Sequence, residues 1–104
     1  MERIDIIKQF LEDTPDDSFL HHCLALENIK LGNKEEARTI FRQLLERDPG
    51  HVGSYYHYGQ LLEVMSFLDQ AEDAYLRGIE AAKASGDRRA LSELRAAYEY
   101  LTTP

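Results

Sequence analysis

The feature that most constrains the fold of this chain is an internal repeat with a period of 34 residues. Shifting the first 17 residues by one period superimposes six identical pairs, where chance would give about one. These pairs are Glu2/Glu36, Ile6/Ile40, Gln9/Gln43, Leu11/Leu45, Glu12/Glu46 and Pro15/Pro49. A second shift pairs Ala37 with Ala71 and Phe41 with Tyr75. A unit of this length cannot bury its apolar side alone, so we expect neighbouring units to pack together.

Apolar residues recur at helical spacing within each unit. Ala37, Ile40, Phe41, Leu44 and Leu45 follow the pattern i, i+3, i+4, i+7 and i+8, which predicts an amphipathic helix. No segment alternates apolar and polar residues as a strand would. Similar stripes predict six helices, over residues 2–13, 17–31, 34–47, 51–65, 67–83 and 87–101.

Turn residues separate the second and third of these helices. Gly32 is expected to end the second helix in the left-handed conformation that glycine adopts readily. Asn33 lies three residues before Glu36, which predicts that the Asn33 side chain caps the third helix.

The repeat resembles the tetratricopeptide repeat family, whose 34-residue pattern combines large packing residues, small residues, a turn glycine, an aromatic residue and a closing proline. Residues 18–51 supply Leu24, Ala25, Leu31, Gly32, Ala37, Phe41 and Pro49, and residues 52–85 supply Tyr55, Tyr58, Gly59, Leu62, Ala71 and Tyr75. Four positions depart from the pattern. His21 replaces a preferred Trp, Asn28 a preferred aromatic residue, Ser66 the turn glycine and Lys83 the closing proline. Without that proline, the fifth helix is expected to run on until Gly86.

The resemblance implies an all-α fold in which antiparallel helix hairpins stack as a short right-handed α-solenoid of about six helices. Residues 1–104 would form one domain, with an N-terminal half-repeat helix (1–17), two repeats (18–51 and 52–85) and a C-terminal capping helix (86–104). Small residues would let paired helices approach closely, at Ala25 with Ala37 and at Gly59 with Ala71. In the first helix we expect Ile6 to be exposed and four apolar residues to face inward. These four are Ile4, Ile7, Phe10 and Leu11.

Charge and composition exclude several kinds of partner. The chain is acidic, with 12 Lys and Arg against 19 Asp and Glu, so we expect no nucleic-acid partner. A lone cysteine cannot form an intramolecular disulfide, and the opening MERIDIIKQFLED lacks the unbroken apolar run of a signal peptide. No run is long enough to span a bilayer. These features predict a cytoplasmic protein without a membrane partner.

The segment FLHHCLALE, residues 19–27, places two histidines beside the only cysteine. On a helix, His21, His22 and Cys23 spread over roughly 200° and cannot converge on one metal ion. We therefore expect no metal at this segment, with His21 partly buried instead. The sequence also contains no Gly-rich phosphate loop, no G-x-S-x-G, no C-x-x-C and no H-E-x-x-H, so we expect no cofactor and no enzymatic activity. One alternative remains, a metal- or thiol-dependent enzyme that uses Cys23 with His57, because these two residues lie one period apart.

The resemblance also implies a function, the non-catalytic binding of a protein or peptide in a concave groove lined by the first helix of each repeat. The expected groove residues are Phe19, His22, Cys23, Leu26, Ile29, Lys30, Tyr56, His57, Gln60, Glu63 and Val64. Some family members grip a terminal carboxylate with Lys and Asn, but this chain has His22, Leu26, Tyr56 and Gln60 at those positions. We therefore expect an adaptor or scaffold protein whose groove contacts its ligand through apolar and aromatic side chains. The alternative is a homo-oligomer, such as a homodimer, that associates through the exposed first helix bearing Ile6.

Overall fold

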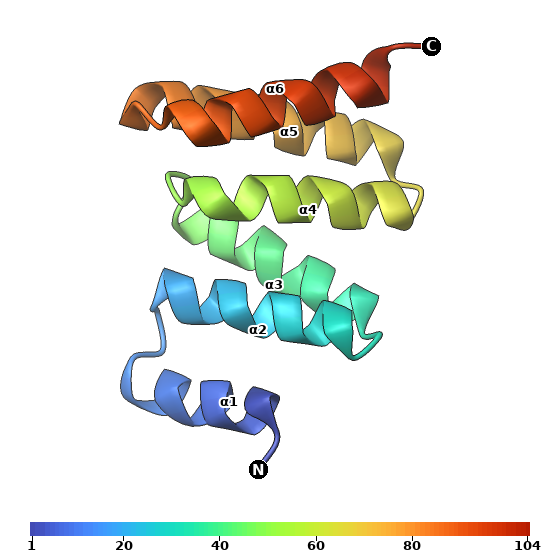
Figure 1. Cartoon of the computed structure of the whole chain (residues 1–104). Coiled ribbons are helices and arrows are strands. Elements are labelled where there is room, and N and C mark those ends of the chain that lie inside the picture. The colour runs from blue at the N-terminus through green and yellow to red at the C-terminus, as the bar shows by residue number, and fades with distance from the viewer. The chain divides into compact units, whose positions relative to one another are not determined.

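A computed structural model describes all 104 residues, which form six α-helices and no strand (Figure 1). Every helix expected from the apolar spacing is present, and each observed end lies within two residues of the expected one. The helices are α1 (Arg3–Asp13), α2 (Ser18–Lys30), α3 (Lys34–Arg47), α4 (Val52–Val64), α5 (Leu68–Ser85) and α6 (Arg88–Thr102). The all-α prediction is confirmed.

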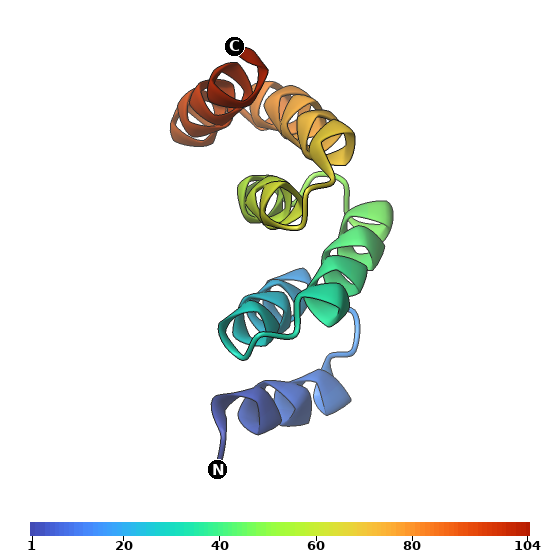
Figure 2. The same ribbon diagram turned by 90° about the vertical axis from the view of Figure 1, so that its right-hand side faces the viewer.

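The helices belong to two compact units, residues 1–48 and residues 49–104. In the first unit, α2 packs against both α1 and α3. In the second unit, α5 packs against α4 and α6, and α6 also contacts α4, so the three helices enclose a triangular core (Figure 2). The contact between α6 and α4 is important for the functional site, because it brings side chains from both helices to one surface.

Three turns between helices use the same backbone geometry. Gly32, Ser66 and Gly86 have φ angles of 84°, 66° and 73°, which is the left-handed region. In each turn, the next residue donates its backbone N–H to the carbonyl five residues earlier, from Asn33 to Asn28, from Phe67 to Leu62 and from Asp87 to Ala82. The expected role of Gly32 is confirmed, and α5 runs on to Gly86 as expected.

The cap predicted at Asn33 is wrong. Asn33 precedes α3, but its side chain makes no capping bond there. Its amide donates instead to the side-chain oxygen of Asn28 at 3.3 Å. Asn28 is buried and also donates to the carbonyl of Leu24 at 2.9 Å. The side chains of the two asparagines therefore stabilise the turn between α2 and α3.

Ser66 holds a conformation that costs a side chain with a Cβ about 1–2 kcal/mol. We expect Ser66→Gly to raise the free energy of unfolding by up to about 1 kcal/mol, because glycine adopts positive φ without that cost but loses more chain entropy on folding. Urea denaturation measures the change. As a control, Ser92→Gly in the exposed part of α6 should lower stability by about 0.5–1 kcal/mol. A loss of stability in Ser66→Gly would contradict the assigned turn.

The core places equivalent residues of the two repeats in equivalent surroundings. Phe41 on α3 and Tyr75 on α5 are both fully buried, as the 34-residue period predicts. Ala37 and Ala71, one turn earlier on the same helices, are also fully buried. Gly59 leaves room for the Tyr75 ring, because a Cβ at Gly59 would overlap three atoms of that ring.

Helix α1 is less buried than the sequence predicts. Ile7 is buried, Ile4 and Leu11 are half-buried, and Ile6 is 40% exposed as expected. Phe10, however, is 58% exposed, so its predicted inward position is wrong. The reason is that α1 packs against α2, which covers only one narrow stripe of α1.

Candidate functional site

Helix α2 carries six of the predicted groove residues, and all six are exposed or half-buried. Phe19 is 65% exposed, whereas Leu26 and Ile29 are half-buried. Ala25 and Asn28, on another side of the helix, are buried. The remaining three predicted residues on α2 are His22 and Cys23, which are half-buried, and Lys30, which is exposed. Helix α2 therefore presents an accessible apolar stripe in addition to its packing face.

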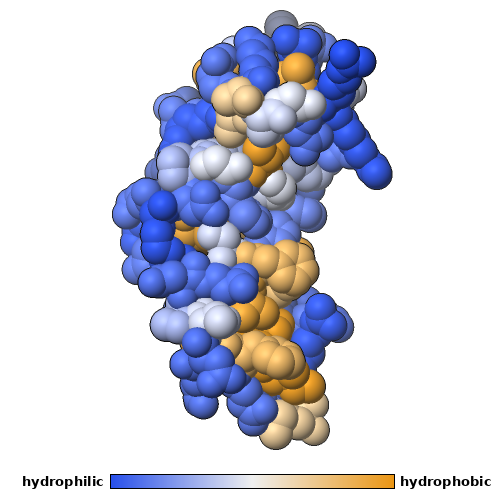
Figure 3. Space-filling model, turned by 90° about the vertical axis from the view of Figure 1, so that its left-hand side faces the viewer, coloured by the Kyte–Doolittle hydropathy of each residue, from blue (hydrophilic) through white to orange (hydrophobic).

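The accessible stripe lies in a larger apolar area of the first unit. Figure 3 shows apolar side chains gathered over the lower half of the molecule, where Figure 1 places α1 and α2. The large exposed apolar residues in these two helices are Ile6, Phe10 and Phe19. Gathered apolar surface of this kind commonly marks an interaction site.

The two adjacent histidines of α2 contact different neighbours. His21 Nε2 lies 2.6 Å from the carbonyl oxygen of Pro15, and its ring is half-buried as expected. The His22 ring instead meets Phe41 edge-on, with 6.0 Å between the ring centroids. Cys23 is a half-buried free thiol. No group of three or more His, Cys, Asp or Glu side chains in the structure is placed to hold a metal ion.

Helix α4 carries the other five predicted groove residues. Val64 is 65% exposed, His57 and Gln60 are exposed, and Tyr56 and Glu63 are half-buried. The side chain of Gln60 donates to the hydroxyl of Tyr56 at 2.8 Å, which holds both side chains against the helix. The neighbouring tyrosines of the segment, Tyr55 and Tyr58, are buried as core residues. Their different burial follows from the roughly 100° between successive helical residues.

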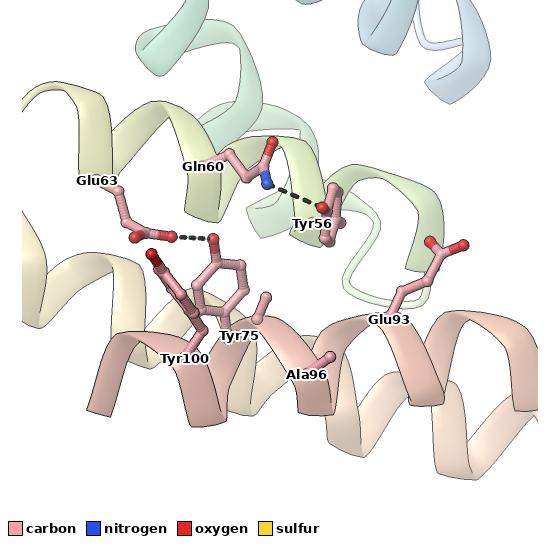
Figure 4. Close-up of a pocket in the computed structure, with 8 residues that line it drawn as sticks. Tyr56, Gln60, Glu63, Tyr75, Glu93, Ala96 and Tyr100 are labelled. Atoms are coloured by element: carbon pink, nitrogen blue, oxygen red, sulfur yellow. Dashed lines mark hydrogen bonds between the residues drawn. The ribbon is translucent and has the colours of Figure 1, made fainter. Parts of the chain in front are cut away.

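A pocket of about 420 Å³ opens between α4, α5 and α6 (Figure 4). Three of its lining residues were predicted for the groove, namely Tyr56, Gln60 and Glu63. The lining contains no Lys or Arg, so it offers carboxylates, an amide and aromatic rings but no cationic side chain. The other lining residues are Tyr75 from α5 and Glu93, Ala96, Ala97 and Tyr100 from α6.

Sequence reasoning missed the contribution of α6 to this pocket. Residues 86–104 were expected to act only as a cap, but α6 contacts α4 as well as α5 and so faces the predicted groove residues of α4. The sequence signal that could have pointed to it is an aromatic residue, Tyr100, placed away from the helix face that buries Leu94. Tyr100 is 87% exposed, which a purely solvent-facing helix does not require.

The phenol of Tyr75 is the most perturbed titratable group of the pocket. Burial raises the pKa of Tyr75 above its usual value, and the hydrogen bond that its hydroxyl donates to Glu63 raises it further. Tyr75 therefore stays protonated at neutral pH and holds the Glu63 carboxylate in place. Desolvation of the partly covered His57 ring lowers its pKa, although Glu93 opposes this shift.

None of the six helices is both long enough and apolar enough to cross a lipid bilayer.

Comparison with known proteins identifies similar sequences and structures. The tetratricopeptide repeat family model matches residues 18–51. A tetratricopeptide repeat domain protein from Salinibacter ruber is 41% identical in its solution NMR structure, with a TM-score of 0.80 over 84% of this chain and 88% of that one. Its crystal structure gives 40% identity and a TM-score of 0.81 over 84% of this chain and 98% of that one.

The fold also recurs at lower sequence identity. The solution structure of a protein from Bordetella parapertussis is 21% identical, with a TM-score of 0.81 over 97% of this chain and 88% of that one. No curated protein sequence matches the chain.

Proposed function

The chain belongs to the tetratricopeptide repeat family, and we propose that it is a non-catalytic interaction module that binds a peptide or protein segment through α2 and α4. Proteins of this family generally mediate protein–protein interaction and generally act as non-catalytic scaffolds. The observation that carries the proposal is the exposure of Phe19 on α2 and of Val64 on α4. Both helices also bury another face against their own unit. The accessible side of α2 is apolar as well, at Phe19, Leu26 and Ile29, and a helix that is apolar on two sides favours a partner.

The residues of these two faces favour an apolar and aromatic contact. The positions at which some family members bind a terminal carboxylate with Lys and Asn carry His22, Leu26, Tyr56 and Gln60 instead. The net charge of −7 also disfavours an acidic ligand. Tyr56 adds contact area at a small entropic cost, which is typical of residues that dominate binding.

Several finer expectations from the sequence belong to the same proposal. We assign residues 18–51 and 52–85 to two repeats, residues 1–17 to a half-repeat and residues 86–104 to a cap. The module would act as an adaptor in the cytoplasm, where a lone half-buried thiol such as Cys23 stays reduced.

The proposal is tested with peptides selected from a random display library against the wild-type protein. We expect the double variant Phe19→Ala, Val64→Ala to bind them at least about fivefold more weakly, because each substitution removes an exposed apolar contact. The matched control is Leu68→Ala, Leu76→Ala, which removes two exposed leucines from α5. Equal binding by wild type and the Phe19, Val64 variant would contradict the proposal, and so would a loss confined to the control.

A second candidate function is self-association through α1. Ile6 and Phe10 are 40% and 58% exposed and lie four residues apart, so they share one face of the helix. Light scattering at high protein concentration tests this candidate. A dimer that becomes a monomer in Phe10→Asp would support it, and a wild-type protein that stays monomeric would exclude it.

A further inference from the structure

We propose that the pocket between α4, α5 and α6 receives a basic side chain, lysine or arginine, from the bound partner. The inference rests on the proposed function and adds the chemistry of one contact. The pocket lies entirely within the second unit, so it needs no contribution from residues 1–48. Its volume of about 420 Å³ exceeds the room that one side chain needs, and it opens to solvent beside the α4 residues of the proposed surface.

Two carboxylates give the pocket its charge. Glu63 from α4 and Glu93 from α6 lie on opposite sides of the view in Figure 4, with tyrosine rings between them. The hydroxyl of Tyr75 orients Glu63 and uses only part of the acceptor capacity of that carboxylate. Because no Lys or Arg lines the pocket, a cationic ligand would meet two carboxylates and no positive charge among the lining residues.

The surroundings of Glu93 leave it available to a ligand. Its carboxylate lies 3.3 Å from Nε of Arg89, but the Arg89 side chain is 91% exposed and the Glu93 side chain 51% exposed. Exposed pairs of this kind contribute little and exchange readily. Partial burial lowers the pKa of His57, although Glu93 opposes this shift, and the lowered pKa favours the neutral imidazole.

The aromatic residues suit the same ligand. Tyr56 and Tyr100 line the pocket from α4 and α6, and a ring face attracts a lysine ammonium or an arginine guanidinium. Tyr100 is 87% exposed, so its ring is accessible to a partner. The small side chains of Ala96 and Ala97 leave space for the aliphatic stem of a basic residue.

The direct test uses three blocked tripeptides, Gly-Arg-Gly, Gly-Lys-Gly and Gly-citrulline-Gly, titrated into labelled protein and followed by backbone amide NMR. We expect the arginine or lysine peptide to shift the amides of Glu63, Glu93 and Tyr100, and the neutral citrulline peptide to bind at least about tenfold more weakly. Equal shifts with citrulline, or no shifts at these residues up to millimolar concentrations, would overturn the inference.

Variants then locate the contact. The double variant Glu63→Gln, Glu93→Gln should bind the arginine and lysine peptides about tenfold or more weakly, since the amides keep the shape of the side chains but lose the charge. Tyr100→Ala should weaken them by about two- to fivefold. The control Glu80→Gln removes one negative charge from an exposed site on α5 and should leave the affinity for these peptides unchanged. An equal loss in Glu80→Gln would show a general charge effect and overturn the assignment to the pocket.

The display-selected peptides separate this inference from the proposed function. Peptide binding could depend on Phe19 and Val64 of the protein and yet be unchanged when every Lys and Arg of the peptide is replaced by a neutral residue. In that case the pocket assignment fails and the proposed surface on α2 and α4 stands. If the peptides require Glu63 and Glu93 but not Phe19 and Val64, the pocket stands and the proposed surface on α2 and α4 fails.

Discussion

We expect Phe41→Ala to lower the free energy of unfolding by about 3–5 kcal/mol. Phe41 is fully buried on α3, and removing its ring leaves a cavity that the surrounding helices cannot fully close. This is a large fraction of the about 5–15 kcal/mol that stabilises a typical domain. Urea denaturation followed by far-ultraviolet circular dichroism measures the loss.

The matched control is the same substitution at an exposed position of the same unit. Phe19 is 65% exposed, so Phe19→Ala should change the free energy of unfolding by no more than about 0.5 kcal/mol. This control also matters for function, because a binding defect in a Phe19 variant is informative only if the fold is intact. Similar losses in Phe41→Ala and Phe19→Ala would contradict the assignment of one residue to the core and the other to the surface.

The second large effect is expected at Gly59 on α4. Alanine is ordinarily the better helix former by about 1 kcal/mol, yet we expect Gly59→Ala to lower the free energy of unfolding by about 1–3 kcal/mol. The added Cβ would overlap the ring of Tyr75. That ring cannot easily move aside, because it is fully buried and its hydroxyl is bonded to Glu63.

Another glycine of the same helix provides the comparison. A Cβ at Gly53 would meet no atom within 4 Å. Gly53→Ala should therefore raise the free energy of unfolding by up to about 1 kcal/mol. Thermal or urea denaturation of the two variants should show shifts of opposite sign. Shifts of the same sign and size would mean that Tyr75 does not pack against Gly59.

Much of the fold follows from the period of the apolar residues. Phe41 and Tyr75 lie 34 residues apart and share the same burial, because a repeated hairpin presents the same position to the same kind of neighbour. The sequence also predicted that helices end at Gly32 and Gly86, and both glycines have a positive φ, which glycine adopts without strain. Ser66 shows that the repeated geometry can impose this conformation on another residue.

The remaining features depend on contacts that the spacing does not encode. The Asn33 side chain can bond either to the backbone at the start of α3 or to the side chain of Asn28. The bond to Asn28 forms because Asn28 lies close by across the turn, which the spacing does not reveal. Phe10 has the correct helical phase for burial, but α2 does not reach that side of α1. The pocket depends on how α6 packs against α4, so the pairing of Glu63 with Glu93 could not be inferred from either helix alone.

The most direct measurement of the proposed binding surface is an amide NMR titration with one display-selected peptide. We expect the largest chemical-shift changes along α2 and α4, at Phe19, Leu26, Tyr56 and Val64, because these residues would lose contact with water when the peptide binds. Changes confined to α1, or to α3 and α5, would contradict the assignment of binding to α2 and α4.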